Sequence, residues 1–390
     1  MEGDFIKINN WLLPFSWLYG LGIGFRNFLF DVGLLKTKTF SIPIISVGNI
    51  TVGGTGKTPH VEYLIQLLKD QVGVAVLSRG YKRKSSGYVV AGKDTTVSDI
   101  GDEPYQMKQK YPNITVAVDR KRVRGIEKLT EDNSKIDVIL LDDAFQHRYV
   151  KPGINILLVD YHRLIIYDKL LPAGRLREPL PGKNRADIVI VTKCPRELRP
   201  MDYRVINKAM NLYAYQHLFF TTLCYDAMHP LYNKKKKKRL LSDIGKDEHV
   251  LLLTGIASPR QMVEDLTPYT NHLSQLSFAD HHNFRAKDIR RINDAFASLP
   301  SPKCIITTEK DEVRLAITDG LSDEVKENIY ALPVKIEFME KQEEKFNENI
   351  IGYVRKNSRN SILAKRKDDN KSKDGHRPGD GPRTISFRDN

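Results

Sequence analysis

The chain has 390 residues, of which 41% are hydrophobic, and a formal net charge of +14. This length allows two domains. The charge favours an acidic partner, which could be a phosphorylated substrate, an anionic membrane surface or a nucleic acid. The three cysteines, Cys194, Cys224 and Cys304, include no C-x-x-C pair. The sequence therefore indicates neither a zinc site nor a disulfide framework.

The N-terminal segment Asn10–Phe30 combines apolar residues with Trp and Tyr. Its uncharged stretch ends at Phe25 and includes Pro14, so it is shorter than the roughly 20 apolar residues of a transmembrane helix. Amphipathic aromatic side chains favour a membrane interface. We predict that residues 1–35 form an amphipathic helix lying on a membrane. The alternative is a helix packed on the protein's own core.

Short apolar runs alternate with helical or loop segments from Ser41 onward. The runs expected to form strands are Ile42–Val47, Val74–Leu77, Val116–Val118, Val138–Leu141, Ile154–Val159 and Ile188–Val191. This alternation predicts an α/β fold with a mostly parallel sheet covered on both faces. We assign this unit to residues 36–215.

A second, smaller α/β unit is expected at residues 216–355, including the segment that connects it to the first unit. Val250–Leu253 and Cys304–Thr307 have the pattern of strands, and Arg260–Leu266 has that of a helix. Residues 356–390 contain few apolar side chains, and we expect them to form a disordered basic tail.

A glycine-rich turn follows the first predicted strand. Residues 48–59 read GNITVGGTGKTP, and an amphipathic segment comes next. A strand, a glycine-rich turn and a helix form the context of a Walker A loop, whose backbone N–H groups surround a nucleotide phosphate. We expect Lys57 to reach the β- and γ-phosphates of ATP and the Thr58 hydroxyl to bind Mg²⁺. The residues expected to hold the nucleotide are Thr51, Val52, Gly53, Gly54, Thr55, Gly56, Lys57 and Thr58.

The loop departs from the strict pattern G-x-x-x-x-G-K-[ST] at Thr51, where the pattern has glycine. We interpret Gly53 and Gly54 as the residues that supply the backbone freedom instead. The alternative is a chance glycine-rich turn, which the preceding strand and the following helix disfavour.

Two acidic pairs are candidates for metal binding and proton transfer. Val138–Leu141 ends in Asp142 and Asp143, as in a Walker B strand, although an ordinary strand followed by an Asp turn has the same pattern. Asp102 and Glu103 lie in a G-D-E-P turn, where they could also cap a helix. Because a kinase needs a carboxylate to deprotonate the attacking hydroxyl, Asp102 is the candidate base.

Arginines cluster in the segments SRGY (78–81), DRKR (119–122) and PAGRLREP (172–179). The guanidinium fork suits phosphate, although some of these arginines are expected to make only surface salt bridges. Two adjacent histidines follow Asp280, and no further residue has metal-ligand spacing to them. A histidine that tunes a catalytic carboxylate therefore fits better than a zinc site.

Taken together, these motifs resemble the tetraacyldisaccharide 4′-kinase family, the lipid A kinases. The matching segments follow the family's order over about residues 40–315: GNITVGGTGKTP (48–59), SRGY (78–81), GDEP (101–104), DDAFQHRYV (142–150), PAGRLREP (172–179), TGIASPRQM (254–262), ADHHNF (279–284) and TTEKD (307–311). Thr51 resembles the family's own loop. The chain departs from the family at Ala144, where glycine is usual, and at Arg175.

The resemblance implies a P-loop NTPase-type fold and an ATP-dependent kinase. Its acceptor would be the 4′-hydroxyl of a tetraacyl glucosamine disaccharide 1-phosphate, at the cytoplasmic face of a bacterial inner membrane. Asp102 would be the base, with His281 rather than His282 as its partner. We expect a peripheral monomer with no nucleic-acid partner. The candidates for magnesium are Thr58, Asp142, Asp143, Glu103 and Glu178, and those for substrate phosphate are Arg79, Arg120, Arg122 and Arg177.

Two other functions are rivals to this interpretation: a P-loop nucleotide switch or partner-binding ATPase, and a nucleic-acid-binding protein. A guanine-nucleotide switch would carry N-K-x-D, and the segment Thr192–Pro195 has only the lysine. Partner-binding ATPases of the metallochaperone type carry a lysine where Val52 stands. Charge alone suggests a nucleic-acid-binding protein, but the sequence contains no recognisable recognition module.

Overall fold

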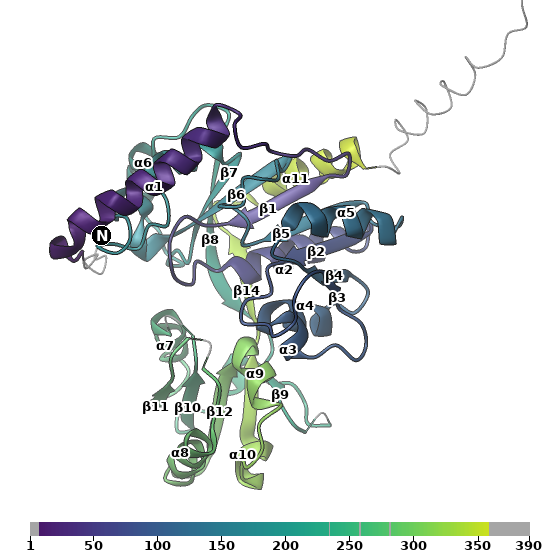
Figure 1. The fold of residues 1–390 in the computed structure, drawn as a ribbon. Helices are drawn as coiled ribbons and strands as arrows, with labels where there is room; N and C mark the ends of the chain where they lie inside the picture. The colour runs from purple at the N-terminus through teal and green to yellow at the C-terminus, as the bar shows by residue number, and fades with distance from the viewer. Residues whose placement is uncertain (1–7, 234, 257–258, 281, 359–390) are drawn as a thin grey trace, which may run out of the picture.

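The computed structural model describes residues 8–233, 235–256, 259–280 and 282–358, and it contains two sheets (Figure 1). The larger sheet has nine strands in the order β14-β8-β7-β6-β1-β5-β2-β4-β3. In chain order these strands are β1 (Ile44–Gly48), β2 (Val74–Ser78), β3 (Val89–Val90), β4 (Thr115–Val118), β5 (Val138–Asp142), β6 (Ile154–Asp160), β7 (Ile188–Thr192), β8 (His217–Tyr225) and β14 (Val334–Phe338).

Parallel pairing dominates this sheet and confirms the predicted α/β fold. The antiparallel pairs are β14 with β8 and β3 with β4, at the two ends of the sheet. Strands β1, β2, β5 and β7 are buried along their whole length. Continuous burial is what a parallel sheet needs when helices cover both of its faces.

Helices from different parts of the chain cover the two faces of the larger sheet. On one face, Ile45 and Val47 belong to a core shared with four helices: α2 (Lys57–Leu68), α3 (Val97–Ile100), α4 (Asp102–Lys110) and α11 (Glu343–Asn357). On the opposite face, Ile44 and Leu157 belong to cores that include two helices: α5 (Arg122–Asp132) and α6 (Pro200–Met210). Short 3₁₀ turns lie at Asn10–Leu12, Tyr161–Arg163, Ile165–Tyr167, Leu180–Arg185 and Leu241–Asp243.

The smaller sheet has five strands in the order β11-β10-β12-β13-β9. The strands are β9 (His229–Pro230), β10 (His249–Thr254), β11 (His272–Ser277), β12 (Lys303–Thr308) and β13 (Ile329–Leu332). The helices of this unit are α7 (Arg260–Leu266), α8 (Ala286–Ala297), α9 (Glu309–Leu315) and α10 (Asp323–Asn328). Helix α8 contributes to the core on one face and α7 to the core on the other.

The chain passes from the larger sheet to the smaller one after β8 and returns before β14. Residues 216–355, the range expected for the second unit, therefore include two strands and one helix, α11, that belong to the larger sheet. Tyr225 pairs with Val334, so the two crossing segments lie side by side. We propose that the smaller unit begins near residue 226 and ends near residue 333. The tail expected at 356–390 lies, from residue 359 onward, outside the described residues.

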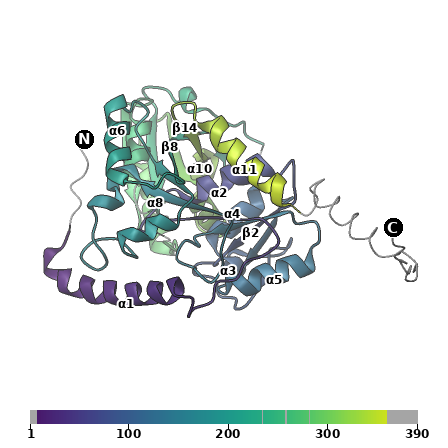
Figure 2. The same ribbon diagram turned by 90° about the horizontal axis from the view of Figure 1, so that it is seen from above.

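Helix α1 (Leu13–Asp31) lies along one side of the larger unit, away from α11 (Figure 2). One face of α1 packs on the protein. The Ser16 hydroxyl lies 3.0 Å from the carbonyl of Leu170, and the Tyr19 hydroxyl donates to the carbonyl of Arg177 at 2.7 Å. The opposite face exposes large apolar side chains: Phe15, Trp17, Leu18, Leu21, Phe25 and Phe28. Trp11, in the preceding 3₁₀ turn, is also exposed. Within the described residues, no helix combines the length and apolar character needed to span a bilayer.

Candidate active site

The phosphate loop leaves β1 beside the segment that carries Arg175 and Arg177. The backbone N–H of Val52 donates to the carbonyl of Arg175 at 2.8 Å, and the N–H of Arg177 donates to the carbonyl of Ile50 at 2.7 Å. Thr51 lies between these bonds, buried, and forms an antiparallel bridge with Leu176. A β-branched residue suits extended backbone. The departure from the strict pattern is therefore a short piece of β-structure.

The turns of the loop are made at two glycines. Gly53 has φ +120° and Gly56 has φ +80°, conformations that side chains disfavour. The φ angle of Gly54 is not positive. We expected both Gly53 and Gly54 to supply the backbone freedom that Thr51 lacks, and this expectation is right for Gly53 only. Helix α2 then begins at Lys57, and Pro59 is tolerated in its first turn.

Residues at the ends of strands on one side of β1 support the phosphate loop through hydrogen bonds. The Thr192 hydroxyl, at the end of β7, donates to the carbonyl of Thr55 at 3.0 Å. The Lys193 amine donates to the carbonyl of Gly54 and pairs with Asp160 at 2.7 Å. Sequence reasoning noticed Lys193 only as a fragment of a guanine motif. Its position shows that it supports the loop itself.

His60 fixes the start of α2. Burial lowers the pKa of His60 to about 4, so the imidazole is neutral at physiological pH. Its Nδ1 lies 2.7 Å from the carbonyl of Gly56, which can only accept, so Nδ1 carries the proton. Its Nε2 then accepts from the hydroxyl of Thr221, 3.1 Å away on β8.

Two carboxylates, Asp142 as the last residue of β5 and Asp143 after it, lie beside the loop because β5 pairs with β1. Lys57 Nζ and an Nη1 of Arg177 each lie 3.5 Å from Asp143 Oδ1. The Ser78 hydroxyl donates to Asp142 Oδ2 at 3.0 Å. Oδ1 of Asp142 is inaccessible to solvent and accepts no hydrogen bond within the described part of the chain, whereas Oδ1 of Asp143 already faces two positive charges. A buried oxygen such as Oδ1 of Asp142 suits a cation.

The two carboxylates titrate in opposite directions. Burial, followed by the charges of Glu103 and Asp143, raises the pKa of Asp142 to about 7. Burial also acts on Asp143, but the positive charges of Lys57 and Arg177 outweigh it and lower the pKa of this carboxyl. Asp143 is thus stably ionised, whereas the ionised form of Asp142 would be stabilised by a nearby cation.

The other magnesium candidates have different surroundings. Glu103 is close enough to raise the pKa of Asp142, and it pairs with Lys310 at 2.6 Å. Glu178 is buried, and its two oxygens accept from Gln146 at 3.0 Å and from Arg185 at 2.8 Å. Among the described residues, no three His, Cys, Asp or Glu side chains form a ready-made metal cluster. A magnesium site with few protein ligands, completed by phosphates and water, fits this arrangement.

Asp102 opens helix α4 after Gly101, whose φ is +91°. A side chain at Gly101 would come within 2.7 Å of the carbonyl of Tyr81, so glycine is required there. Asp102 pairs with Arg314 of helix α9, in the smaller unit, at 2.6 Å. The structure thus brings the candidate base to the junction of the two units.

Of the adjacent histidines, His281 lies outside the described residues. His282 is engaged within the smaller unit. Its Nε2 lies 2.9 Å from Asp288 Oδ2, and its ring stacks on Phe278 with a centroid separation of 4.9 Å. His282 is thus occupied at the start of helix α8, which leaves His281 as the histidine we propose for Asp102.

Three of the four candidate arginines lie near the carboxylates Asp142 and Asp143, and one does not. Arg122 is buried and donates to the backbone carbonyl of Asp142 at 3.0 Å. Burial lowers its pKa to about 10, so it stays charged at neutral pH. Arg79 is exposed but near enough to influence Arg122, and Arg177 faces Asp143. Arg120 is exposed, and its charge acts on Arg83, away from these carboxylates.

Sequence reasoning missed several residues of this site. They are Ser78, Gln146, His147, Lys193 and Arg314. His147 is an example: burial, then the charges of Arg122, Arg26 and Arg79, lower its pKa to about 4. The segments SRGY and DDAFQHRYV already contained Ser78, Gln146 and His147, but nothing local to these segments assigned them a role.

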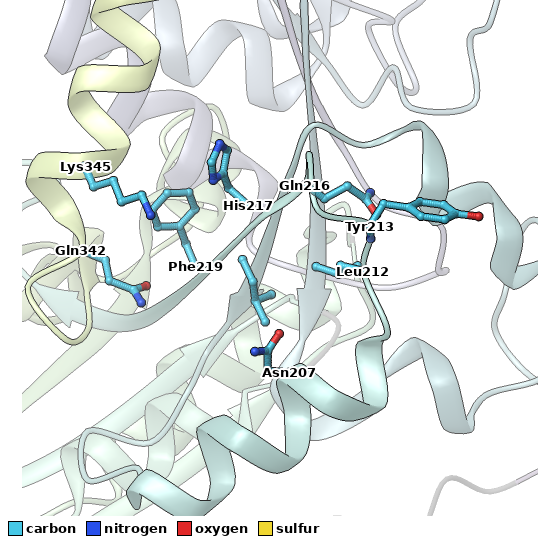
Figure 3. A pocket seen from close by; sticks show the side chains of 9 residues that line it. Asn207, Leu212, Tyr213, Gln216, His217, Phe219, Gln342 and Lys345 are labelled. Carbon is cyan, nitrogen blue, oxygen red and sulfur yellow. The ribbon is translucent and has the colours of Figure 1, made fainter.

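Two adjoining cavities lie elsewhere, between α6, β8 and the start of α11. They measure about 320 and 340 Å³ and share Asn207, Leu218 and Gln342. Figure 3 shows Lys345 reaching from α11 toward Phe219 and His217. No residue of the phosphate loop lines either cavity, so neither is the candidate active site.

A parallel sheet with a braced phosphate loop, and two carboxylates on the strand beside it, defines a P-loop nucleotide-binding protein. Arginines around those carboxylates add the positive charge typical of phosphoryl transfer. The chain belongs to the LpxK family, tetraacyldisaccharide-1-P 4′-kinase, whose model matches residues 8–354.

Individual relatives agree with this family. A tetraacyldisaccharide 4′-kinase of Phocaeicola vulgatus is 60% identical over 93% of this chain and 99% of its own length. One of Bacteroides thetaiotaomicron is 52% identical over 95% of this chain and 100% of its own length. A crystal structure of LpxK from Aquifex aeolicus in complex with ATP matches with a TM-score of 0.66 at 32% identity, over 88% of this chain and 98% of that one.

Proposed function

We propose that this protein transfers the γ-phosphate of ATP to the 4′-hydroxyl of a tetraacyl glucosamine disaccharide 1-phosphate, a step of lipid A biosynthesis. The observation that carries the proposal is the placement of Asp142, Asp143 and Lys57 at one phosphate loop, in a chain of this family. A switch or partner-binding ATPase would need the same loop, but not a carboxylate that deprotonates an acceptor hydroxyl, which is the role we propose for Asp102.

Each group has a role in this reaction. Lys57 and the loop N–H groups bind the nucleotide phosphates, and Asp102 takes the proton of the acceptor hydroxyl as its oxygen bonds to phosphorus and ADP leaves. Arg177, Arg122 and Arg79 supply positive charge to the phosphates. Thr58, Asp142, Asp143 and Glu103 would hold Mg²⁺, which neutralises phosphate charge when bound. Glu178 and Arg120, engaged or placed elsewhere, have supporting roles at most.

We further propose that the enzyme is peripheral on the cytoplasmic face of the inner membrane and works as a monomer. The exposed apolar face of α1 and the 3₁₀ turn before it support the membrane part of this proposal, with Trp17 70% and Trp11 84% exposed. Scattered apolar residues need no explanation, but a continuous apolar helix face does. The net charge of +14 suits an anionic leaflet and a phosphorylated acceptor.

Labelled ATP offered with three acceptors tests the function. The acceptors are the disaccharide monophosphate lipid in detergent micelles, a nucleoside and a protein. We expect label in the lipid only, dependent on Mg²⁺ and lost on EDTA addition. Label in the nucleoside or protein, or none in the lipid with ATP still hydrolysed, would contradict the proposal.

A further inference from the structure

We propose that Arg314, on helix α9 of the smaller unit, is a positioning residue for the catalytic base Asp102. The inference rests on the proposed function, in which Asp102 accepts the proton of the acceptor hydroxyl. It assigns a catalytic contribution to the segment after TTEKD, which otherwise has none.

The Arg314 guanidinium contacts the Asp102 carboxylate closely, and both contacts are to one oxygen. Arg314 Nη2 lies 2.6 Å and Nε lies 3.0 Å from the same carboxylate oxygen, Oδ2 of Asp102. The Arg314 side chain is 4% exposed and that of Asp102 18%. A charged pair that water hardly reaches has well-defined geometry, unlike an exposed ion pair.

Arg314 is itself held rigidly by the smaller sheet. Its Nη1 lies 3.1 Å from Asp311 Oδ1. Asp311 is fully buried and accepts from the N–H of Gly255 at 2.9 Å and from the hydroxyl of Thr308 at 2.7 Å. Gly255 follows β10 and Thr308 ends β12, so the carboxyl ends of two strands set the direction of the guanidinium.

This geometry determines how Asp102 meets the acceptor. Because both guanidinium nitrogens bind Oδ2, they hold that oxygen in place and limit rotation of the carboxylate. The larger unit alone then carries an incompletely oriented base.

Two neighbouring ion pairs offer the competing explanation, a purely structural contact between the units. Helices α4 and α9 are also joined by Lys310–Glu103 at 2.6 Å and by Lys110–Glu309 at 2.8 Å. The second of these does not touch Asp102, and Lys110 keeps a second partner, Glu62, at 2.7 Å. Glu309→Gln is therefore a matched control, since it removes one pair between the same two helices.

The experiment compares Arg314→Gln, Arg314→Lys and Glu309→Gln in the full-length protein, with phosphate transfer to the lipid, affinity for a non-hydrolysable ATP analogue and thermal unfolding measured. We expect Arg314→Gln to lower kcat roughly 10- to 100-fold, part of the contribution that a general base makes, with analogue affinity within about threefold. Arg314→Lys, which keeps the charge but not the fork, should recover part of kcat. Glu309→Gln should stay within about threefold of wild type.

A double-mutant cycle gives the decisive readout. In an Asp102→Asn background, Arg314→Gln should cause little further loss, because the group that it positions is already absent. Full additivity of the two losses, or equal effects of Arg314→Gln and Glu309→Gln, would overturn the inference. Absence of lipid phosphorylation by the wild-type protein would instead contradict the proposed function itself.

Discussion

Asp142 and Asp143 are adjacent in the chain but have opposite effects on stability. The raised pKa of Asp142 means that its contribution to stability is fully present below its ordinary value near 4 and is lost as pH rises through about 7. The lowered pKa of Asp143 has the reverse sign: its contribution is present at neutral pH and is lost as pH falls. In the free protein the ionised form of Asp142 therefore lowers the stability, and the same carboxylate is available to bind a cation.

Asp142→Asn should therefore stabilise the nucleotide- and metal-free protein at pH 8. The asparagine removes a buried charge whose cost is on the order of a few kcal/mol, judged from its pKa displacement. The gain should shrink at pH 5, where the wild-type carboxyl is largely protonated in the folded state. Thermal unfolding in EDTA at both pH values measures it.

Asp143→Asn is the matched control for that experiment. It removes a carboxylate paired with Lys57 and Arg177, so it should destabilise the protein at pH 8, and less so in acid. Melting temperatures that shift in the same direction for both variants at pH 8 would contradict the assigned signs.

Asp102 and Lys57 should separate nucleotide binding from chemistry. Asp102→Ala should leave ATP affinity nearly unchanged and lower kcat roughly 10²- to 10⁴-fold, the usual contribution of a general base. Lys57→Ala should weaken both, because Lys57 contacts phosphate in the ground state and in the transition state. Equilibrium binding of an ATP analogue and initial rates measure the two effects, and an Asp102→Ala enzyme with near-normal turnover would refute the base assignment.

At the scale of elements, helix α1 combines the two alternatives that its sequence left open, a helix on a membrane and a helix packed on the protein's own core. Ser16, Tyr19 and the buried Phe30 attach one face to the larger unit, while the opposite face stays apolar and exposed. Arg148 strengthens the attachment by pairing with Asp31 at 2.5 Å. The helix is thus packed on the protein's own core and also presents a surface for lipid, which remains a proposal.

Charged substitutions on the exposed face of α1 should release the protein from membranes. Trp17→Glu with Leu21→Glu removes apolar contact area without disturbing Ser16 or Tyr19. We expect co-sedimentation with anionic phospholipid vesicles to fall at least about tenfold, since each buried side chain contributes about 1.5–3 kcal/mol. Met201→Glu, at an exposed apolar position on α6, is the control and should bind as wild type. Unchanged sedimentation of the α1 variant would argue against the anchor.

At the scale of the whole molecule, the smaller unit is an insertion between two paired strands. Because Tyr225 faces Val334 in the β8–β14 pair, residues 226–333 begin and end close together. The larger sheet and its helices form their own cores without this segment. We therefore treat the smaller unit as a module that completes the active site.

Replacing residues 226–333 by a two-residue Asn-Gly turn should leave a folded nucleotide-binding protein. The turn matches an antiparallel pair, and the phosphate loop keeps its braces on β7 and β8. We expect cooperative unfolding and retained affinity for an ATP analogue, with phosphate transfer reduced at least ~100-fold because Arg314 and His281 are gone. An unfolded product would contradict the proposed unit boundaries, and retained transfer would contradict a role of the smaller unit in catalysis.

Much of this protein could be predicted from local sequence. The strand, glycines and GKT of residues 42–58 specify a phosphate loop because backbone freedom, a helix N-terminus and an ammonium group are all that a phosphate needs. Apolar runs specified the parallel strands β1, β2 and β4–β7. The motif order also predicted the family, because several short motifs in series are far more specific than one.

The tertiary structure decided what depends on pairing between distant segments. No local signal could show that β8 and β14 belong to the larger sheet, that Thr51 bridges to Leu176, or that Glu178 is engaged by Gln146 and Arg185. Likewise, Asp102 and Arg314 are 212 positions apart and meet only because two sheets dock at α4 and α9. Residue type sets which groups can react, but orientation and pKa depend on neighbours that only the folded chain brings within a few ångströms.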